Sequence, residues 1–236
     1  MVLIHEQVME NVRKDPSWVV LDSICTSLHR KVRDGFNIKS EESFKTMLSR
    51  CGGCSIKKER VFRTVLPEGD FKSRYVFVGR NPGIKEGEKG RPFFPKAPGG
   101  SLFQEYLLRL GLQREEVYIT NANFCYTRGD RAPELNELFK CSLWKPIEFG
   151  FLTECRFLFL MGNHAVREFL GIDYPSILTF YGKTFWAYNP YNLNQRMMVI
   201  PVLHPGYVLR NRGIQEILNK QLDYIRVILD KDRGGG

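Results

Sequence analysis

The chain has 236 residues, which is enough for one sizeable α/β domain with a short extension. Apolar residues make up 43% of it, so a packed core can form and wholesale disorder is excluded. No stretch approaches the roughly 18 apolar residues of a membrane span, and the N-terminus lacks the pattern of a secretory signal peptide. We therefore expect a cytoplasmic monomer with no membrane partner.

The chain carries a formal net charge of +9. This charge is compatible with ordinary solubility, and also with attraction to a polyanion such as DNA or RNA. Charge alone leaves both interpretations open.

Residues 1–50 predict a peripheral helical extension, and residues 51–74 predict a loop with a possible hairpin. Four short, uniformly apolar runs follow, as expected of strands buried on both faces, at 75–78, 117–120, 157–161 and 198–203. Helical patterns lie between and after them, at 102–110, 134–151, 164–170 and 214–229. Strands that alternate with helices predict an α/β fold with a parallel sheet covered on both sides.

Each predicted strand leads into a polar or glycine-rich segment. These segments lie at 79–83, 121–123, 162–164 and 204–206. In an open parallel sheet, ligands bind beyond the carboxyl ends of the strands. Four such segments in register predict a binding site at that edge.

The cysteines divide into two groups. Cys51 and Cys54 form a C-x2-C pair, while Cys125 and Cys141 are separated by fifteen residues. Four thiolates can hold either zinc or a 4Fe–4S cluster, and the wide second spacing favours a cluster that links distant segments. The alternative is that Cys125 and Cys141 are small buried hydrophobes. We expect Cys25 and Cys155 to be of that kind.

Three segments become specific when they are taken together. They are 79–93 with the sequence GRNPGIKEGEKGRPF, the run 118–121 followed by Cys125 and Cys141, and the triplet 204–206 with the sequence HPG. In this combination, residues 51 to about 212 resemble the family-4 uracil-DNA glycosylases. The first motif of that family reads G-E-x-P-G-x-x-E-D-x-x-G-x-P-F and aligns here without a gap.

The resemblance implies a three-layer α/β/α sandwich around a four-stranded parallel sheet, formed by residues 51–236, with residues 1–50 as the extension. It implies a structural 4Fe–4S cluster, with zinc as the alternative, on Cys51, Cys54, Cys125 and Cys141. It also implies a monofunctional DNA glycosylase, which flips a pyrimidine out of DNA, hydrolyses its N-glycosidic bond and leaves an abasic site.

The chemistry requires an aromatic surface for the flipped base, an amide that reads its edge and a donor for the departing base. By the resemblance, Phe93 stacks on the base and Asn121 reads the pyrimidine edge. His204 donates a hydrogen bond to the leaving base, which is a form of preorganised oxyanion stabilisation. The water has two candidates, Asn81 and Glu86. We favour Asn81, because mismatch-specific and single-strand-selective branches of the superfamily carry asparagine there.

The chain departs from the family pattern within the predicted substrate pocket, to which we assign Gly79, Arg80, Gly83 and Asn123. Arg80 stands where glutamate is usual, and Gly87 replaces an aspartate. Gly83 leaves no side chain to block the C5 position of a pyrimidine, and Asn123 adds a second amide. We hypothesise that the substrate is a C5-modified pyrimidine, such as the hydroxymethylated or glucosylated cytosine of some phage DNA, rather than uracil alone.

The segment after His204 resembles a loop that enters the minor groove. Tyr207 or Leu209 would fill the gap left by the flipped base. Arg210 and Arg212 would hold phosphates. The alternative is a helical turn with a solvated basic face. For the whole chain, the competing hypotheses are a non-catalytic DNA-binding module and a four-cysteine zinc protein.

Overall fold

The computed structural model describes residues 38–57, 61–170, 176–189 and 192–234. The predictions for residues 1–37, including Cys25, lie outside this part of the chain. Within the predicted extension, helix α3 (Glu41–Ser49) begins at an N-cap formed by Ser40, whose hydroxyl accepts from the backbone N–H of Ser43. A capping serine of this kind satisfies one of the N–H groups that the first turn leaves unpaired.

The core of the fold is a five-stranded sheet in the order β2-β1-β3-β5-β4. The strands are β1 (Tyr75–Gly79), β2 (Val117–Asn121), β3 (Phe157–Met161), β4 (Phe185–Asn189) and β5 (Asn192–Val202). The four predicted parallel strands are confirmed. The fifth strand, β4, was not predicted and pairs antiparallel with β5. Its mixed burial resembles that of an edge strand, so it lacks the uniformly apolar run that identified the other four.

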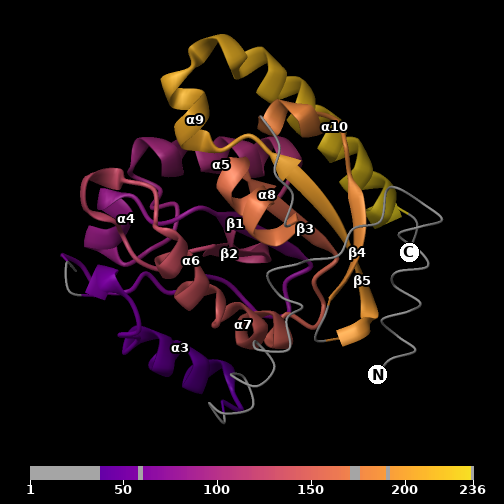
Figure 1. The fold of residues 1–236 in the computed structure, drawn as a ribbon. Helices are drawn as coiled ribbons and strands as arrows, with labels where there is room; N and C mark the ends of the chain where they lie inside the picture. The colour runs from indigo at the N-terminus through magenta and orange to yellow at the C-terminus, as the bar shows by residue number, and fades with distance from the viewer. Residues whose placement is uncertain (1–37, 58–60, 171–175, 190–191, 235–236) are drawn as a thin grey trace.

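The sheet lies between two helical layers, as predicted (Figure 1). Helices α5 and α10 lie together on one side, and α3, α6 and α7 lie on the other. The remaining α-helices are α5 (Pro98–Leu110), α6 (Leu135–Ser142), α7 (Lys145–Phe151), α8 (Gly162–Leu170) and α10 (Gln215–Gly234), with the short α4 (Ile84–Lys89) and α9 (Pro205–Arg210). Single 3₁₀ turns occur at Ser55–Lys57, Arg114–Glu116, Arg128–Asp130, Ile177–Phe180 and Arg212–Ile214.

The structure corrects two local details of the prediction. The helix predicted over 134–151 is divided into α6 and α7, because Pro146 lacks a backbone N–H and its ring would clash with the carbonyl of Ser142 in a continuous helix. The loop predicted at 51–74 is confirmed, because the described residues of that segment are irregular, with one 3₁₀ turn and a single bridge between Glu68 and Ile119. These described residues do not form the possible hairpin.

The strands β1, β2 and β3 are buried at every position, as a sheet covered on both faces requires. Phe77 and Phe159 stack across β1 and β3 with ring centroids 4.2 Å apart. Strand β2 is the neighbour of β1 on one edge, and β3 is its neighbour on the opposite edge, so the chain reverses its direction across the sheet after β2. This change of direction opens a crevice at the carboxyl ends of β1 and β3, where ligands bind in α/β proteins. In the described residues, no helix is long and apolar enough to cross a membrane.

Candidate active site

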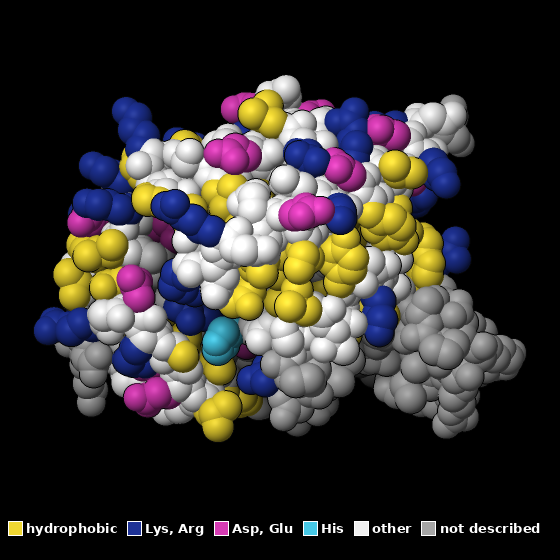
Figure 2. Space-filling view, turned by 90° about the horizontal axis from the view of Figure 1, so that it is seen from above, with side chains coloured by type: hydrophobic (Ala, Val, Ile, Leu, Met, Phe, Trp, Pro, Cys, Tyr) yellow, Lys and Arg dark blue, Asp and Glu magenta, His cyan; other side chains and the backbone are white. Residues whose placement is uncertain are grey.

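A cavity of about 900 Å³ lies beyond the carboxyl ends of β1, β3 and β5. Nine of the residues predicted from sequence line it: Arg80, Asn81, Gly83, Glu86, Phe93, His204, Tyr207, Leu209 and Arg210. Both described histidines also line it, and the face seen in Figure 2 carries a histidine with Lys and Arg side chains around it. Residues far apart in the sequence therefore form one site, as the strand-end pattern predicted.

His204 is the N-cap of α9 and follows the end of β5. The backbone N–H of Gly206 donates to its Nδ1 over 3.0 Å, so the neutral ring carries its proton on Nε2. Burial, followed by the nearby charges of Arg80, Arg210 and His164, lowers the pKa of His204 from 6.5 to about 4. Near neutral pH the residue is therefore a neutral hydrogen-bond donor through Nε2.

Asn81 is buried directly after β1. Its Nδ2 donates to the carbonyl of Pro82 and to the hydroxyl of Thr127, each over 3.3 Å. Its Oδ1 accepts from Nε of Arg80, and the same guanidinium donates to the carbonyl of Asp130 over 3.3 Å. The Asn81 amide is thus held in one orientation, and Arg80 helps to hold it.

Glu86 lies in the first turn of α4, and both of its carboxylate oxygens accept backbone N–H groups. Oε2 accepts from Gly83 over 2.6 Å, and Oε1 accepts from Phe93. Burial raises the pKa of Glu86, and these two hydrogen bonds oppose the rise. The carboxylate therefore ties the start of α4 to the residue that carries the predicted stacking ring.

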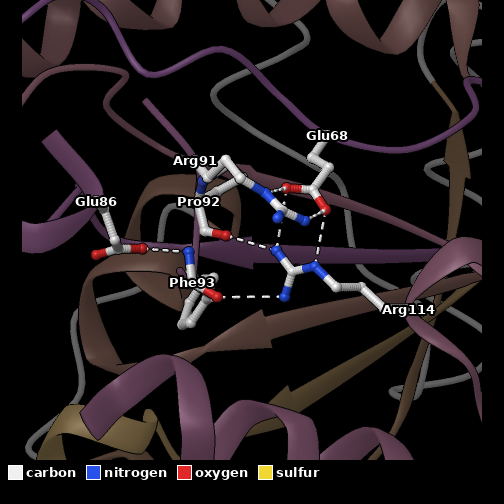
Figure 3. A network of polar contacts seen from close by, with 6 residues as sticks. All are labelled: Glu68, Glu86, Arg91, Pro92, Phe93 and Arg114. Carbon is white, nitrogen blue, oxygen red and sulfur yellow. Dashed lines mark hydrogen bonds and ion pairs between the residues drawn. The ribbon is translucent and has the colours of Figure 1, made fainter. Parts of the chain in front are cut away.

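The loop that carries Phe93 is anchored by a polar network (Figure 3). Arg114 donates to the carbonyls of Pro92 and Phe93 over 2.7 and 3.2 Å. Arg114 and Arg91 both donate to the carboxylate of Glu68. Burial by itself raises the pKa of Glu68, but the hydrogen bonds and charges of the two arginines outweigh burial and lower the pKa to about 2. This network supports a positive φ of 45° at Phe93, which a non-glycine residue rarely adopts.

Gly79 and Asn121 lie directly against Phe93. A Cβ atom at Gly79 would stand 2.3 Å from Oδ1 of Asn121 and 2.8 Å from the Phe93 ring. Glycine is therefore required for the amide and the ring to approach the end of β1 so closely. The Phe93 ring also contacts His204, with centroids 5.7 Å apart. Gly79, Phe93 and Asn121, which were all predicted to bind substrate, therefore form one cluster. Of these three residues, only Phe93 lines the cavity itself.

Two predicted residues lie elsewhere. Arg212 begins a 3₁₀ turn after α9 and does not line the cavity. Asn123 does not line this cavity but lines a second one, together with the four predicted ligand cysteines. The backbone explains this, because Asn123 N–H donates to the carbonyl of Arg80 over 2.8 Å and the chain then turns toward Cys125.

Sequence reasoning assigned no role to His164, which lines the cavity directly after β3. Burial and the charges of Arg80 and Arg167 lower its pKa. Its neighbour Asn163 accepts the backbone N–H of Ile177 over 2.8 Å and so ties α8 to the cavity wall. The only sequence signal was its position at a strand end.

The four predicted ligand cysteines line a second cavity of about 520 Å³. Trp144 Nε1 donates to Cys51 Sγ over 3.3 Å, and the Phe124 N–H donates to Cys141 Sγ over 3.4 Å. Hydrogen bonds to sulfur favour the thiolate, which is the form that binds metals. Among the described residues, no group of three or more His, Cys, Asp or Glu is spaced to hold a metal ion. The four cysteines nevertheless line one cavity together with two N–H groups that donate to sulfur, and four thiols with such donors are a ligand set suited to an iron–sulfur cluster. Cys155 is buried, as expected.

Comparison with known proteins agrees with this geometry. The family model of the uracil-DNA glycosylase superfamily matches residues 66–230. The chain belongs to this superfamily, and its enzyme class is that of the DNA glycosylases. The type-4 uracil-DNA glycosylase of Sulfurisphaera tokodaii is 30% identical over 191 residues, which cover 79% of this chain and 84% of that protein. The type-4 uracil-DNA glycosylase of Thermotoga maritima is 29% identical over 187 residues, or 78% and 92% of the two chains.

Proposed function

We propose that the protein removes a pyrimidine carrying a substituent at C5, by flipping it from DNA into the 900 Å³ cavity and hydrolysing its N-glycosidic bond. The observation that carries this proposal is the small-residue wall of the cavity. Gly83, Ala97, Gly99 and Gly100 line it. A Cβ atom added at Gly99 would meet nothing within 4 Å, whereas one at Gly83 would stand 3.2 Å from Oε2 of Glu86 and one at Gly100 would clash with the Phe94 carbonyl. The open space at this wall therefore lies at Gly99.

In this proposal the Phe93 ring stacks on the base and Asn121 hydrogen-bonds its edge. His204 donates from Nε2 to the departing base, which leaves as an anion. Asn81 orients the attacking water, since one of the two lone pairs on its Oδ1 remains beside Arg80. Glu86 serves chiefly to hold the Phe93 loop, because both of its oxygens already accept backbone N–H groups.

DNA would bind through the α9 segment. Leu209 is 43% exposed at the cavity edge, which suits a side chain that fills the gap left in the stack. Arg210 and Arg212 are exposed and would contact phosphates. Because C5-modified cytosines occur in phage DNA, defence against phage would be the biological setting.

We further propose that Cys51, Cys54, Cys125 and Cys141 hold a 4Fe–4S cluster. Their shared cavity and the N–H donors on Cys51 and Cys141 support this assignment. The cluster would join α3, the β2–α6 connection and α6 into one unit, which is a structural contribution.

The test is mass spectrometry of the bases released from duplexes that contain uracil, hydroxymethylcytosine or glucosylated hydroxymethylcytosine. We expect release of a C5-modified base, and its loss in Asn81→Ala and His204→Ala. Lys220→Ala, on an exposed part of α10, is the matched control and should release base at the wild-type rate. Release from uracil DNA alone would contradict the C5 assignment. Release that persists in both cavity variants would contradict the assigned site.

A further inference from the structure

Asn123 is buried with its side-chain polar groups unmatched. The residue is 1% exposed, and neither Nδ2 nor Oδ1 has a hydrogen-bond partner among the described residues. Its backbone N–H is already satisfied by the carbonyl of Arg80. An unpaired buried polar group destabilises the fold, so a folded protein rarely retains one without a partner.

The location of Asn123 indicates what that partner is. The residue lines the cavity that Cys51, Cys54, Cys125 and Cys141 share, and it precedes Cys125 by two residues. Two other N–H groups already donate to sulfur in the same cavity, from Trp144 and Phe124. A third donor on the same wall would complete a set directed at sulfur.

We propose that the Asn123 amide donates a hydrogen bond from Nδ2 to a sulfur atom of the cluster. This inference rests on the proposed cluster and gives Asn123 the function of a positioning and tuning residue. Hydrogen bonds to sulfur stabilise the more negatively charged, reduced state of an iron–sulfur cluster and so raise its reduction potential.

The test compares holoenzymes of the wild type, Asn123→Leu and Asn123→Ala, purified without oxygen. The cluster's one-electron couple is titrated with dithionite and mediators and followed by visible absorbance. We expect the midpoint potential of both variants to shift to more negative values. Resonance Raman spectra in H₂O and D₂O should show a deuterium-sensitive Fe–S band that is reduced in both variants. Asn123→Ala introduces no added bulk, so it serves if Asn123→Leu fails to fold.

Asn189→Leu is the matched control. Asn189 is also a buried asparagine, but its amide donates to the carbonyl of Phe149 over 3.1 Å and to Gln195 over 2.8 Å. We expect this variant to lower the thermal midpoint and to leave the potential and the Raman bands unchanged.

Two results would overturn the inference. If Asn123 has no partner, both variants remove an unsatisfied group, so the potential stays unchanged and Asn123→Leu unfolds at a higher temperature than the wild type. If the purified protein holds zinc, the inference fails while base release still supports the glycosylase. A shifted potential in a protein that releases no base would instead contradict the proposed glycosylase function alone.

Discussion

His204 illustrates how a single side chain is prepared for its proposed role. The Gly206 N–H occupies Nδ1, so the proton of the neutral ring is carried by Nε2. Burial and the charges of Arg80 and Arg210 keep the ring neutral. A neutral donor can strengthen its hydrogen bond as the departing base becomes anionic, and this differential binding is what lowers a barrier.

Replacing His204 by alanine should lower the single-turnover rate of base release by about 10²–10³-fold, which is the usual cost of removing one oxyanion donor. The affinity for substrate DNA should change little, because the lost interaction strengthens only as the bond breaks. His204→Asn keeps an N–H donor and should lose less. Wild-type rates in His204→Ala would show that His204 is not the donor.

The lowered pKa of His204 also predicts how stability depends on pH. The unfolded chain takes up a proton near pH 6.5, whereas the folded protein does so only near pH 4. The free energy of unfolding should therefore fall as the pH decreases from 6.5 to 4, by at most about 1.4 kcal/mol per pH unit from this group. Denaturant unfolding at a series of pH values should show a smaller slope in His204→Gln. The raised pKa of Glu86 has the opposite effect, because its uptake of a proton in the folded state increases the free energy of unfolding as the pH decreases. This contribution is the same in the wild type and in His204→Gln, so the difference between the two proteins isolates His204.

At the scale of elements, the loop between α4 and α5 is held from both ends. Glu86 ties it to α4, and Arg114 ties it to the chain before β2. This double attachment supports the positive φ of Phe93 and the position of its ring. The site therefore depends on contacts that lie outside the cavity.

Arg114→Met should lower the free energy of unfolding by about 1.5–3 kcal/mol, because two buried carbonyls and Glu68 lose a charged donor. Base release should fall as well, since Phe93 is less well held. Arg91→Met is the matched control: Arg91 contacts the same Glu68, but its side chain is 48% exposed against 8% for Arg114. Exposed pairs contribute about 0–1 kcal/mol. Equal losses in the two variants would contradict the anchoring function.

Helix α7 contains a buried ion pair, and both of its members form hydrogen bonds with β2. Lys145 Nζ lies 2.7 Å from Glu148 Oε2 and 2.5 Å from the carbonyl oxygen of Asn121, and Tyr118 donates to Glu148 Oε1 over 3.0 Å. Lys145→Met leaves the Glu148 carboxylate buried without its cation and should cost about 3–5 kcal/mol of unfolding free energy. The double variant Lys145→Met with Glu148→Leu should recover much of this loss. Chemical denaturation of the three proteins measures it, and a double variant less stable than Lys145→Met would contradict the pairing.

At the scale of the whole molecule, charge and shape act together. The chain has a net charge of +9, and the cavity edge carries Arg80, Lys85 and Arg210. In the proposed function, this cavity at the edge of the sheet would attract the DNA polyanion through these cations and would admit one flipped base. The affinity for DNA should therefore decrease steeply with salt.

Arg210→Gln and Arg212→Gln should each weaken binding about equally for all sequences and reduce the salt slope of log K by about 1. Fluorescence anisotropy with a duplex of fixed sequence at several salt concentrations measures this slope. Lys220→Gln, whose side chain is 66% exposed on α10 beside Glu216, should leave it unchanged. An unchanged slope in Arg210→Gln would show that the solvated basic face is the better description.

Much of this architecture follows from local pattern. Uniformly apolar runs predicted the four parallel strands, and the polar residues after them predicted the edge that holds the cavity. Strand β4 was not predicted because an edge strand is buried irregularly. The division between α6 and α7 was not predicted either, although Pro146 is a sequence signal for it. His164 was noticed only as part of a strand end.

What the sequence determined by itself was the periodicity of the elements, the spacing of the cysteines and the order of the motif residues, because these depend on neighbours along the chain. Only the tertiary structure decided which side chains share a cavity. Asn121 and Asn123 are two residues apart, yet one packs against Gly79 and Phe93 while the other lies with the cysteines. The reason is the end of β2: once the strand stops, hydrogen bonds from Ala122 and Asn123 to the β1 end redirect the chain. Such a turn is set by contacts between distant segments, which no local pattern contains.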